Sequence, residues 1–281
     1  MAEIEQFLSE QDYSEQTVMV YRYYLSLLAA SVPNLETMDA AIFVKWLGGQ
    51  GWGRSTQYLA GCAARAFLRW RYGAKHPALL YRIKRREPPP QRTLTAEEVE
   101  TLYRGFGSDD GGRRDLAMLS VFLDTGLRAS EICRLALDHL HLEEKYLSVE
   151  VKGGNWAEKS FSLITSMDLD NWLVVRDYHA LDGVPTVFVS LGGNTPGKPL
   201  TRDGLRAIVR KWGERAGIDH ISPHAFRRTA ATLGAEDGAS DQLLMQQFGW
   251  KSAQMVRRYT RKLQNRAFAD DHSPVTKVRG G

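Results

Sequence analysis

Three consecutive prolines, Pro88 to Pro90, divide this 281-residue chain within its first third. A proline ring blocks the continuation of a helix and supplies no amide to a strand ladder, so no regular element can run through this point. A basic run precedes the prolines, which is typical of an exposed linker. The length also suits about two domains of ordinary size. We therefore predict a first domain over residues 1–86, a linker over 87–94 and a second domain over 95–281.

The first domain has the apolar spacing of helices. One stripe with three- and four-residue intervals is made by Val18, Tyr21, Leu25 and Leu28. Such a stripe predicts an amphipathic helix with one buried face. Ser55 is a candidate N-cap for a further helix that runs to Tyr72. The first domain is therefore predicted to be a small helical bundle.

The second domain begins with the pattern of a capping box, because Thr95 and Glu98 are three residues apart. Helices are predicted over residues 113–123, with a stop near Gly126, and over residues 130–137. Residues 145–151 and 159–164 alternate like two strands on either side of a glycine-rich turn. The pattern is mostly helical from residue 168 onward. The predicted fold is thus mainly α, with a small β-sheet in an α+β second domain.

Basic residues are unevenly distributed along a chain whose net charge is +4. The first fifty residues contain only two cations, whereas the stretch after Gly51 is rich in arginine. Double-stranded DNA is a partner that fits this asymmetry, and a solvated charged face explains it equally well. The candidate DNA-contacting residues are Arg54, Arg65, Arg69, Arg71, Arg85 and Arg86.

Several classes of function find no support in the sequence. No signal peptide and no membrane-length apolar run is visible, so we expect the protein in the cytoplasm. Cys62 and Cys133 lie in helical patterns and are expected to be reduced core thiols. Residues 192–198 resemble the opening of a phosphate loop, but a proline replaces the required Ser or Thr. His220 and His224 have the four-residue spacing of metal ligands on one helix, but Pro223 opposes a continuous helix through both. Neither a metal site nor a cofactor is therefore predicted.

Five residues have side chains suited to chemistry on a phosphodiester: Arg128, Lys152, His224, Arg227 and Tyr259. A phosphodiester under attack gains negative charge on its non-bridging oxygens, and guanidinium groups match those oxygens in pairs. His224 and Arg227 are three residues apart in a helix that Ser222-Pro223 should open, so they share one face. Taken singly, each residue is better explained by an ordinary surface or capping role.

Four segments resemble the conserved boxes of the tyrosine recombinases of the phage integrase family, in the same order and at similar spacing. They are Thr125-Gly-Leu-Arg-Ala-Ser-Glu-Ile132, His224-Ala-Phe-Arg227, Phe248-Gly-Trp-Lys-Ser252 and Arg258-Tyr259-Thr260. The resemblance covers the whole chain and points to the simple two-domain, Xer/Cre-like type. It implies a helical, SAM-like core-binding domain before the linker and a catalytic domain after it.

The resemblance also implies a role for each matched residue. Arg128 and Arg227 would bind the scissile phosphate, with Glu131 as the acidic residue that supports the first of them. Lys152 would be the hairpin lysine, His224 the first histidine and Tyr259 the nucleophile. Trp250 occupies a position that is often histidine, and indole cannot accept a proton. Arg228 also stands where a histidine is common, which puts the fine geometry of the site in question.

The reaction implied by this resemblance is the breakage and rejoining of DNA strands. Tyr259 would form a 3′-phosphotyrosine, with His224 as proton acceptor and Lys152 as the acid for the leaving 5′-oxygen. Lys159 is the alternative acid. Strand exchange through a Holliday junction would require a homotetramer on DNA, assembled from a chain that is monomeric when free. A predicted tail helix over residues 261–271 would pack either into a neighbouring protomer or onto its own domain. A non-catalytic DNA-binding regulator and a topoisomerase are the competing functions.

Overall fold

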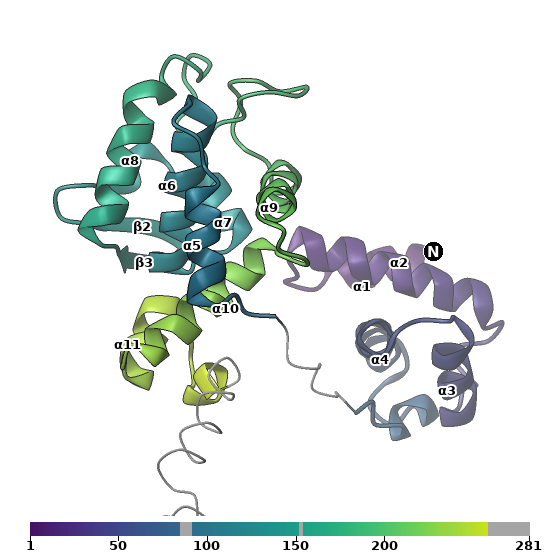
Figure 1. Ribbon diagram of the computed structural model, residues 1–281. Coiled ribbons are helices and arrows are strands. Elements are labelled where there is room, and N and C mark those ends of the chain that lie inside the picture. Colours follow the sequence, from purple (N-terminus) through teal and green to yellow (C-terminus); the bar gives the residue numbers. More distant parts are fainter. Residues whose placement is uncertain (85–91, 152–153, 258–281) are drawn as a thin grey trace, which may run out of the picture. The chain divides into compact units, whose positions relative to one another are not determined.

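The computed structural model describes residues 1–84, 92–151 and 154–257 of the chain (Figure 1). The chain forms two compact units, Met1–Pro90 and Gln91–Gly281.

The first unit is helical. Its elements are α1 (Ala2–Ser9), α2 (Glu15–Ser31), α3 (Ala40–Gly49), α4 (Arg54–Tyr72) and a short 3-10 turn, η1 (Pro77–Leu80). The apolar stripe predicted from the sequence lies in α2, where Leu25 and Leu28 are buried. Aromatic rings from separate helices complete this core, with the centroids of Phe7 and Phe67 5.6 Å apart. The helical bundle predicted for this part of the chain is confirmed.

The predicted cap of the long helix α4 is wrong. The helix begins at Arg54, and its N-cap is Gly53, which has extended backbone angles and offers no side-chain cap. Ser55 is already inside the first turn. Glycine is accepted at an N-cap because the position needs extended backbone before it needs a side chain.

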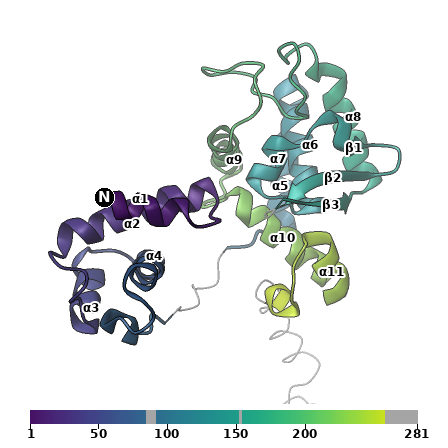
Figure 2. The same cartoon turned by 180° about the vertical axis from the view of Figure 1, so that it is seen from behind.

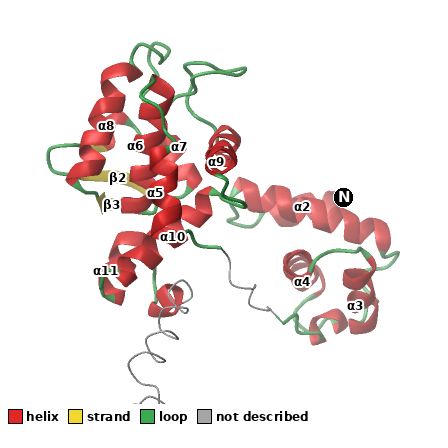
Figure 3. Ribbon diagram, in the orientation of Figure 1, coloured by secondary structure: helices red, strands yellow, loops and turns green. Residues whose placement is uncertain are grey.

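The second unit is mainly helical, with one small sheet (Figure 3). Its helices are α5 (Ala96–Arg104), α6 (Asp110–Thr125), α7 (Ala129–Arg134), α8 (Leu163–Arg176), α9 (Arg202–Ala216), α10 (Pro223–Glu236), α11 (Asp241–Phe248) and the 3-10 turn η2 (Leu137–His139). Its strands, β1 (Leu140–His141), β2 (Tyr146–Val151) and β3 (Asn155–Ser160), form an antiparallel sheet in that order. This arrangement confirms the predicted fold class.

Several predicted boundaries in this unit hold, and others shift. The capping box of Thr95 and Glu98 opens α5, and α6 is closed by its C-cap Gly126, which has left-handed backbone angles. The second strand predicted over residues 159–164 is wrong, because β3 pairs with β2 only as far as Ser160. Ser162 then accepts the amide of Thr165 and opens α8. Helix α7 is also shorter than predicted and ends at Arg134.

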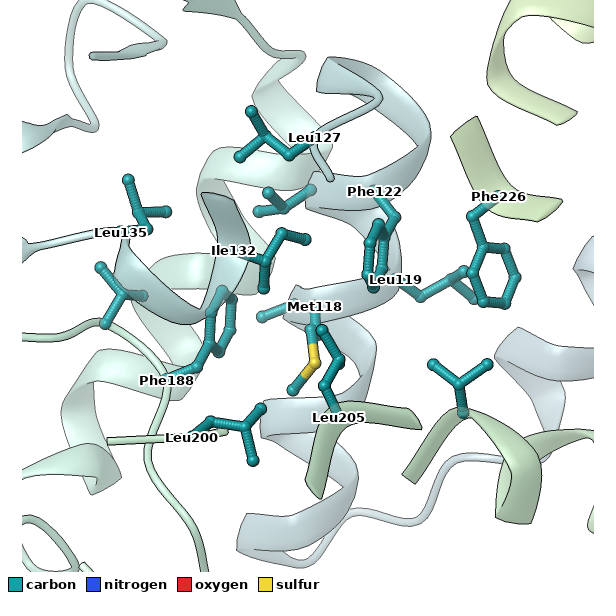
Figure 4. Close-up of a cluster of buried hydrophobic side chains, with 14 of the residues drawn as sticks. Met118, Leu119, Phe122, Leu127, Ile132, Leu135, Phe188, Leu200, Leu205 and Phe226 are labelled. Atoms are coloured by element: carbon teal, nitrogen blue, oxygen red, sulfur yellow. The ribbon is translucent and has the colours of Figure 1, made fainter. Parts of the chain in front are cut away.

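Helix α6 lies at the centre of the second unit. Met118, Leu119 and Phe122 on α6 meet side chains from α7, α9 and α10, including Phe226 (Figure 4). The rings of Phe122 and Phe226 stack with centroids 5.5 Å apart. This packing fixes the end of α6 beside α10, and the candidate functional residues lie at that junction.

No helix in the described ranges is long and apolar enough to cross a membrane.

Candidate active site

Arg128 is held at the start of α7 by Glu131. Its Nη1 donates to Oε1 of Glu131 at 2.7 Å, and its backbone amide donates to Oε2, also at 2.7 Å. The Glu131 side chain is only 3% exposed, whereas the Arg128 side chain is 42% exposed. A buried carboxylate that accepts both bonds fixes one side of the guanidinium and leaves the other side in contact with solvent. Arg128 is therefore an oriented, accessible cation.

Arg227 is the buried counterpart of Arg128. It lies on α10 and is only 3% exposed. Its Nη1 donates to the carbonyl of Gly126 and its Nη2 to the carbonyl of Phe248. The guanidinium carbon also lies 5.7 Å from the ring centre of Phe248 and 5.5 Å from that of Trp250. These contacts supply the hydrogen bonds and ring faces that a buried guanidinium needs.

Gly126 allows the end of α6 to approach Phe248 at the end of α11. Its φ of +57° is in the left-handed region, and a Cβ at this position would lie 2.1 Å from Cε1 of Phe248. A side chain would therefore meet both backbone strain and a collision with an aromatic ring. The glycine predicted as a helix stop is also the point where α6 and the end of α11 come together.

His224 lies in the first turn of α10, three residues before Arg227 and on the same face. Ser222 caps the helix through the amide of Ala225, and Pro223 occupies its first turn, as predicted. The His224 side chain is exposed, but the nearby protein removes part of its hydration. This desolvation and the charges of Arg228, Arg227 and Arg128 lower the pKa of His224. The imidazole is consequently biased toward its neutral form, which can accept a proton.

Lys159 is buried among these groups, on strand β3, and only 3% of it is exposed. Its Nζ donates to the carbonyl of Gln246 at 3.1 Å, which ties β3 to the last turn of α11. Burial lowers the pKa of Lys159 to about 8, assisted by the charges of Arg227 and Arg128 and opposed by that of Glu131. The sequence suggested Lys159 only as an alternative acid, because its burial depends on residues far along the chain.

Trp250 packs beside Arg227. It is 5% exposed, and its ring stacks on that of Phe248 with centroids 5.0 Å apart. The tryptophan at this often-histidine position therefore forms one wall of the Arg227 site. The structure brings together Arg128, Glu131, Arg227, His224, Trp250 and Lys159.

Lys152, Tyr259, Arg85, Arg86 and the predicted tail helix over residues 261–271 lie outside the described residues. The roles assigned to them stay predictions. Among the residues that are described, no cluster of His, Cys, Asp or Glu could hold a metal ion.

The arginines suggested as DNA contacts on α4 divide into two groups. Arg54 and Arg69 are exposed, and no carboxylate of the described residues forms an ion pair with either of them. Arg65 instead donates through Nη1 to the carbonyls of Leu79 and Tyr81. Arg71 donates through Nε to Glu3 at 2.7 Å. Arg54 and Arg69 are thus the two whose guanidinium groups are available to a phosphate.

The buried Lys159 should make the free energy of unfolding of this unit depend on pH. Between about pH 8 and the usual lysine pKa of about 10.5, the unfolded chain keeps a proton on Lys159 that the folded chain has lost. The stability of the parent relative to Lys159→Met should therefore rise with pH in this range, by about 1 kcal/mol per pH unit. Urea unfolding at pH 7, 8, 9 and 10 measures this difference.

Lys211→Met, at an exposed position on α9, is the control, and the stability of the parent relative to it should not change with pH. A difference between the parent and Lys159→Met that does not change with pH would contradict the assignment.

Comparisons with known proteins match the chain to one family. Residues 92–266 match the model of the phage integrase family. The tyrosine recombinase XerC of Corynebacterium efficiens is 29% identical over 258 residues, which cover 88% of this chain and 81% of the relative. The tyrosine recombinase XerA of Pyrococcus furiosus is 26% identical over 262 residues, covering 93% of this chain and 88% of the relative.

Solved structures share the fold. A crystal structure of the XerH site-specific recombinase bound to a palindromic difH substrate aligns with a TM-score of 0.74 and 18% identity, over 90% of this chain and 78% of the other. A lambda integrase tetramer bound to a Holliday junction aligns with a TM-score of 0.71 and 17% identity, over 91% of this chain and 74% of the other. With the family model spanning more than half of its residues, the chain belongs to the phage integrase family and is a tyrosine site-specific recombinase.

Proposed function

We propose that this protein cuts and rejoins DNA at specific sites through a covalent bond between Tyr259 and a 3′-phosphate. The observation that carries the proposal is the junction where Arg128, Arg227 and His224 meet at the ends of α6 and α11. Two guanidinium groups are suited to the negative charge that develops on an attacked phosphate, and an imidazole with a lowered pKa is suited to accept the proton of a tyrosine.

The two arginines stabilise the charge that develops on the phosphate. Arg128 has an accessible guanidinium with one edge fixed on Glu131, so little reorganisation is needed when a phosphate binds. Arg227 supplies positive charge from a site with little water, where each charge interacts more strongly. Together they favour the transition state over the bound ground state.

Proton transfer is divided between two groups. Tyrosine has an ordinary pKa of about 10 and needs a base near neutral pH, a role for which the lowered pKa of His224 is suited. Lys152 is the proposed acid for the leaving 5′-oxygen. Lys159 already donates to the carbonyl of Gln246, which favours a role in holding the end of α11 over that of the acid.

Strand exchange follows from the same chemistry in reverse. The phosphotyrosine keeps the energy of the broken bond, so attack by a 5′-hydroxyl of another strand rejoins the DNA without ATP. Two rounds exchange both strands of two duplexes through a Holliday junction. This pathway requires four active sites, and we therefore propose a homotetramer on DNA. The Holliday-junction tetramer of lambda integrase supports this proposal, since it shares the fold.

The first unit would contact the duplex through α4. Arg54 and Arg69 are fifteen positions apart, which places them within about 60° of each other around the helix axis. Both guanidinium groups are accessible, so one side of α4 can bind phosphates of the backbone. Such contacts position the protein and carry no sequence information directly.

Tyr259→Phe tests the nucleophile, because it removes only the attacking oxygen. Duplexes that this variant selects from a randomised library provide the substrate, which is then nicked beside the cleavage point so that the cut end diffuses away. The parent should form a covalent adduct that survives a denaturing gel. Tyr259→Phe should bind the same duplex with unchanged affinity and form no adduct. An adduct formed by Tyr259→Phe would exclude Tyr259 as the nucleophile.

The salt dependence of binding tests the α4 surface. Each lost phosphate contact should reduce the slope of log affinity against log salt by about 0.9. Arg54→Ala/Arg69→Ala should therefore flatten the slope by about 2 units relative to the parent. Arg22→Ala/Arg71→Ala is the matched control, because these two arginines of the same unit pair with Glu5 and Glu3. Equal slopes for the two double variants would show that α4 does not contact the DNA through Arg54 and Arg69.

A further inference from the structure

Helix α8 carries a row of exposed side chains with the spacing of a coiled coil. The row consists of Ile164, Met167, Asn171 and Val174 on α8, together with Tyr178 in the turn that follows the helix, and we call it the α8 seam. The intervals alternate between three and four residues, as in the a and d positions of a heptad. The four apolar members are 70%, 58%, 64% and 85% exposed, in chain order.

The opposite face of α8 is packed into the core of the second unit. Leu169 and Trp172 are buried in the core of the second unit, and the Trp172 indole donates to the carbonyl of Val187 at 2.9 Å. Both views of the ribbon place α8 at the edge of this unit, with α6 on its inner side (Figures 1 and 2). The α8 seam is therefore not needed to fold the unit. A single exposed apolar side chain is ordinary, but a continuous row of them marks an interaction surface.

The charges beside the α8 seam are acidic. In the heptad, Asp170 takes a g position and Asp177, the C-cap of α8, follows at the next g position. Asp168 takes an e position, but its half-buried carboxylate accepts a hydrogen bond from Oγ of Ser120 at 2.6 Å. The one basic side chain of the helix, Arg176, is 3% exposed and donates to the carbonyls of Thr186 and Val184 from within the unit. It also pairs with Asp177, whose carboxylate remains 83% exposed. The accessible border of the α8 seam thus offers carboxylates and no exposed cation.

This charge pattern distinguishes between possible occupants. A second copy of α8 would give these carboxylates no cationic partner. In an antiparallel pair g positions face g positions, so Asp170 would meet an aspartate, and in a parallel pair it would face the buried Val175. Like charges in such positions oppose pairing. DNA, a polyanion, is disfavoured by the same carboxylates. A helix with apolar residues at a and d and with lysine or arginine at e and g would pack against the apolar row and form ion pairs with the carboxylates beside it.

We propose that the α8 seam is the docking surface for another protein, which contributes one amphipathic helix with basic flanks. Asn171 occupies a central a position, where a polar residue fixes the register by pairing with a polar residue of the partner. The surface lies on the outer side of α8, apart from the residues that form the candidate active site. Docking there leaves Arg128 accessible to DNA.

A synthetic peptide provides the probe. It has three heptads with isoleucine at a, leucine at d, asparagine at the central a position and lysine at every e and g position. The lysines match the acidic border and keep the peptide from pairing with itself. Fluorescence anisotropy of the labelled peptide, with the full chain and without DNA, should show saturable binding that weakens with salt. The same peptide with glutamate at e and g should bind at least tenfold more weakly.

Two double variants complete the test. Met167→Asp/Val174→Asp changes two exposed positions and should weaken binding of the lysine peptide at least tenfold, while cleavage of a nicked duplex stays at the parental level. Met19→Asp/Leu80→Asp, at exposed apolar positions of the first unit, should bind the peptide like the parent. Equal binding of the two peptides, or unchanged binding by Met167→Asp/Val174→Asp, would overturn the proposal. So would light scattering that shows a dimer of the parent and a monomer of that variant, because the occupant would then be a second copy.

Discussion

The buried guanidinium of Arg227 is the interaction on which the geometry of the site depends. Its two terminal nitrogens bond the carbonyls of Gly126 and Phe248, which lie at the C-terminal ends of α6 and α11. Helix C-termini carry unsatisfied carbonyls and partial negative charge, so a cation placed between two of them is stabilised by both. One side chain thereby joins three helices at one point, and removing it would leave two carbonyls buried without their donor.

The neighbouring residues of α10 extend this junction. Arg228 donates to the carbonyl of Arg92, and Thr229 accepts the amide of Leu94 at 2.9 Å. Lys159 and Gln247 fasten α11 to the sheet and to the end of α6. Helix α11 is thus held by several bonds between side chains and backbone in addition to apolar packing. This arrangement explains why the segment that leads toward Tyr259 begins from a fixed position at Gly249 and Trp250.

The sequence predicted those features whose causes are local. The Thr95 capping box, the left-handed Gly126 and the Ser222-Pro223 helix start each depend on residues within one turn. The strand over residues 159–164 was predicted wrongly, because the apolar pattern does not reveal that Ser162 caps α8. The burial of Lys159 was not predictable, since its acceptor on Gln246 is 87 residues away. The α8 seam is not predictable from the sequence, because both faces of this helix carry apolar residues and only the structure shows which face is buried in the core.

The most direct test of the central claim is the cleavage rate of a substrate that carries a neutral methylphosphonate in place of the scissile phosphate. If Arg128 stabilises negative charge on that phosphate, Arg128→Ala should cut the ordinary substrate about 10²–10³-fold more slowly than the parent. On the methylphosphonate, which lacks that charge, the two proteins should differ by less than about tenfold. If the deficit of Arg128→Ala is equally large on both substrates, Arg128 does not act on the charge of the phosphate and the account of the site is wrong.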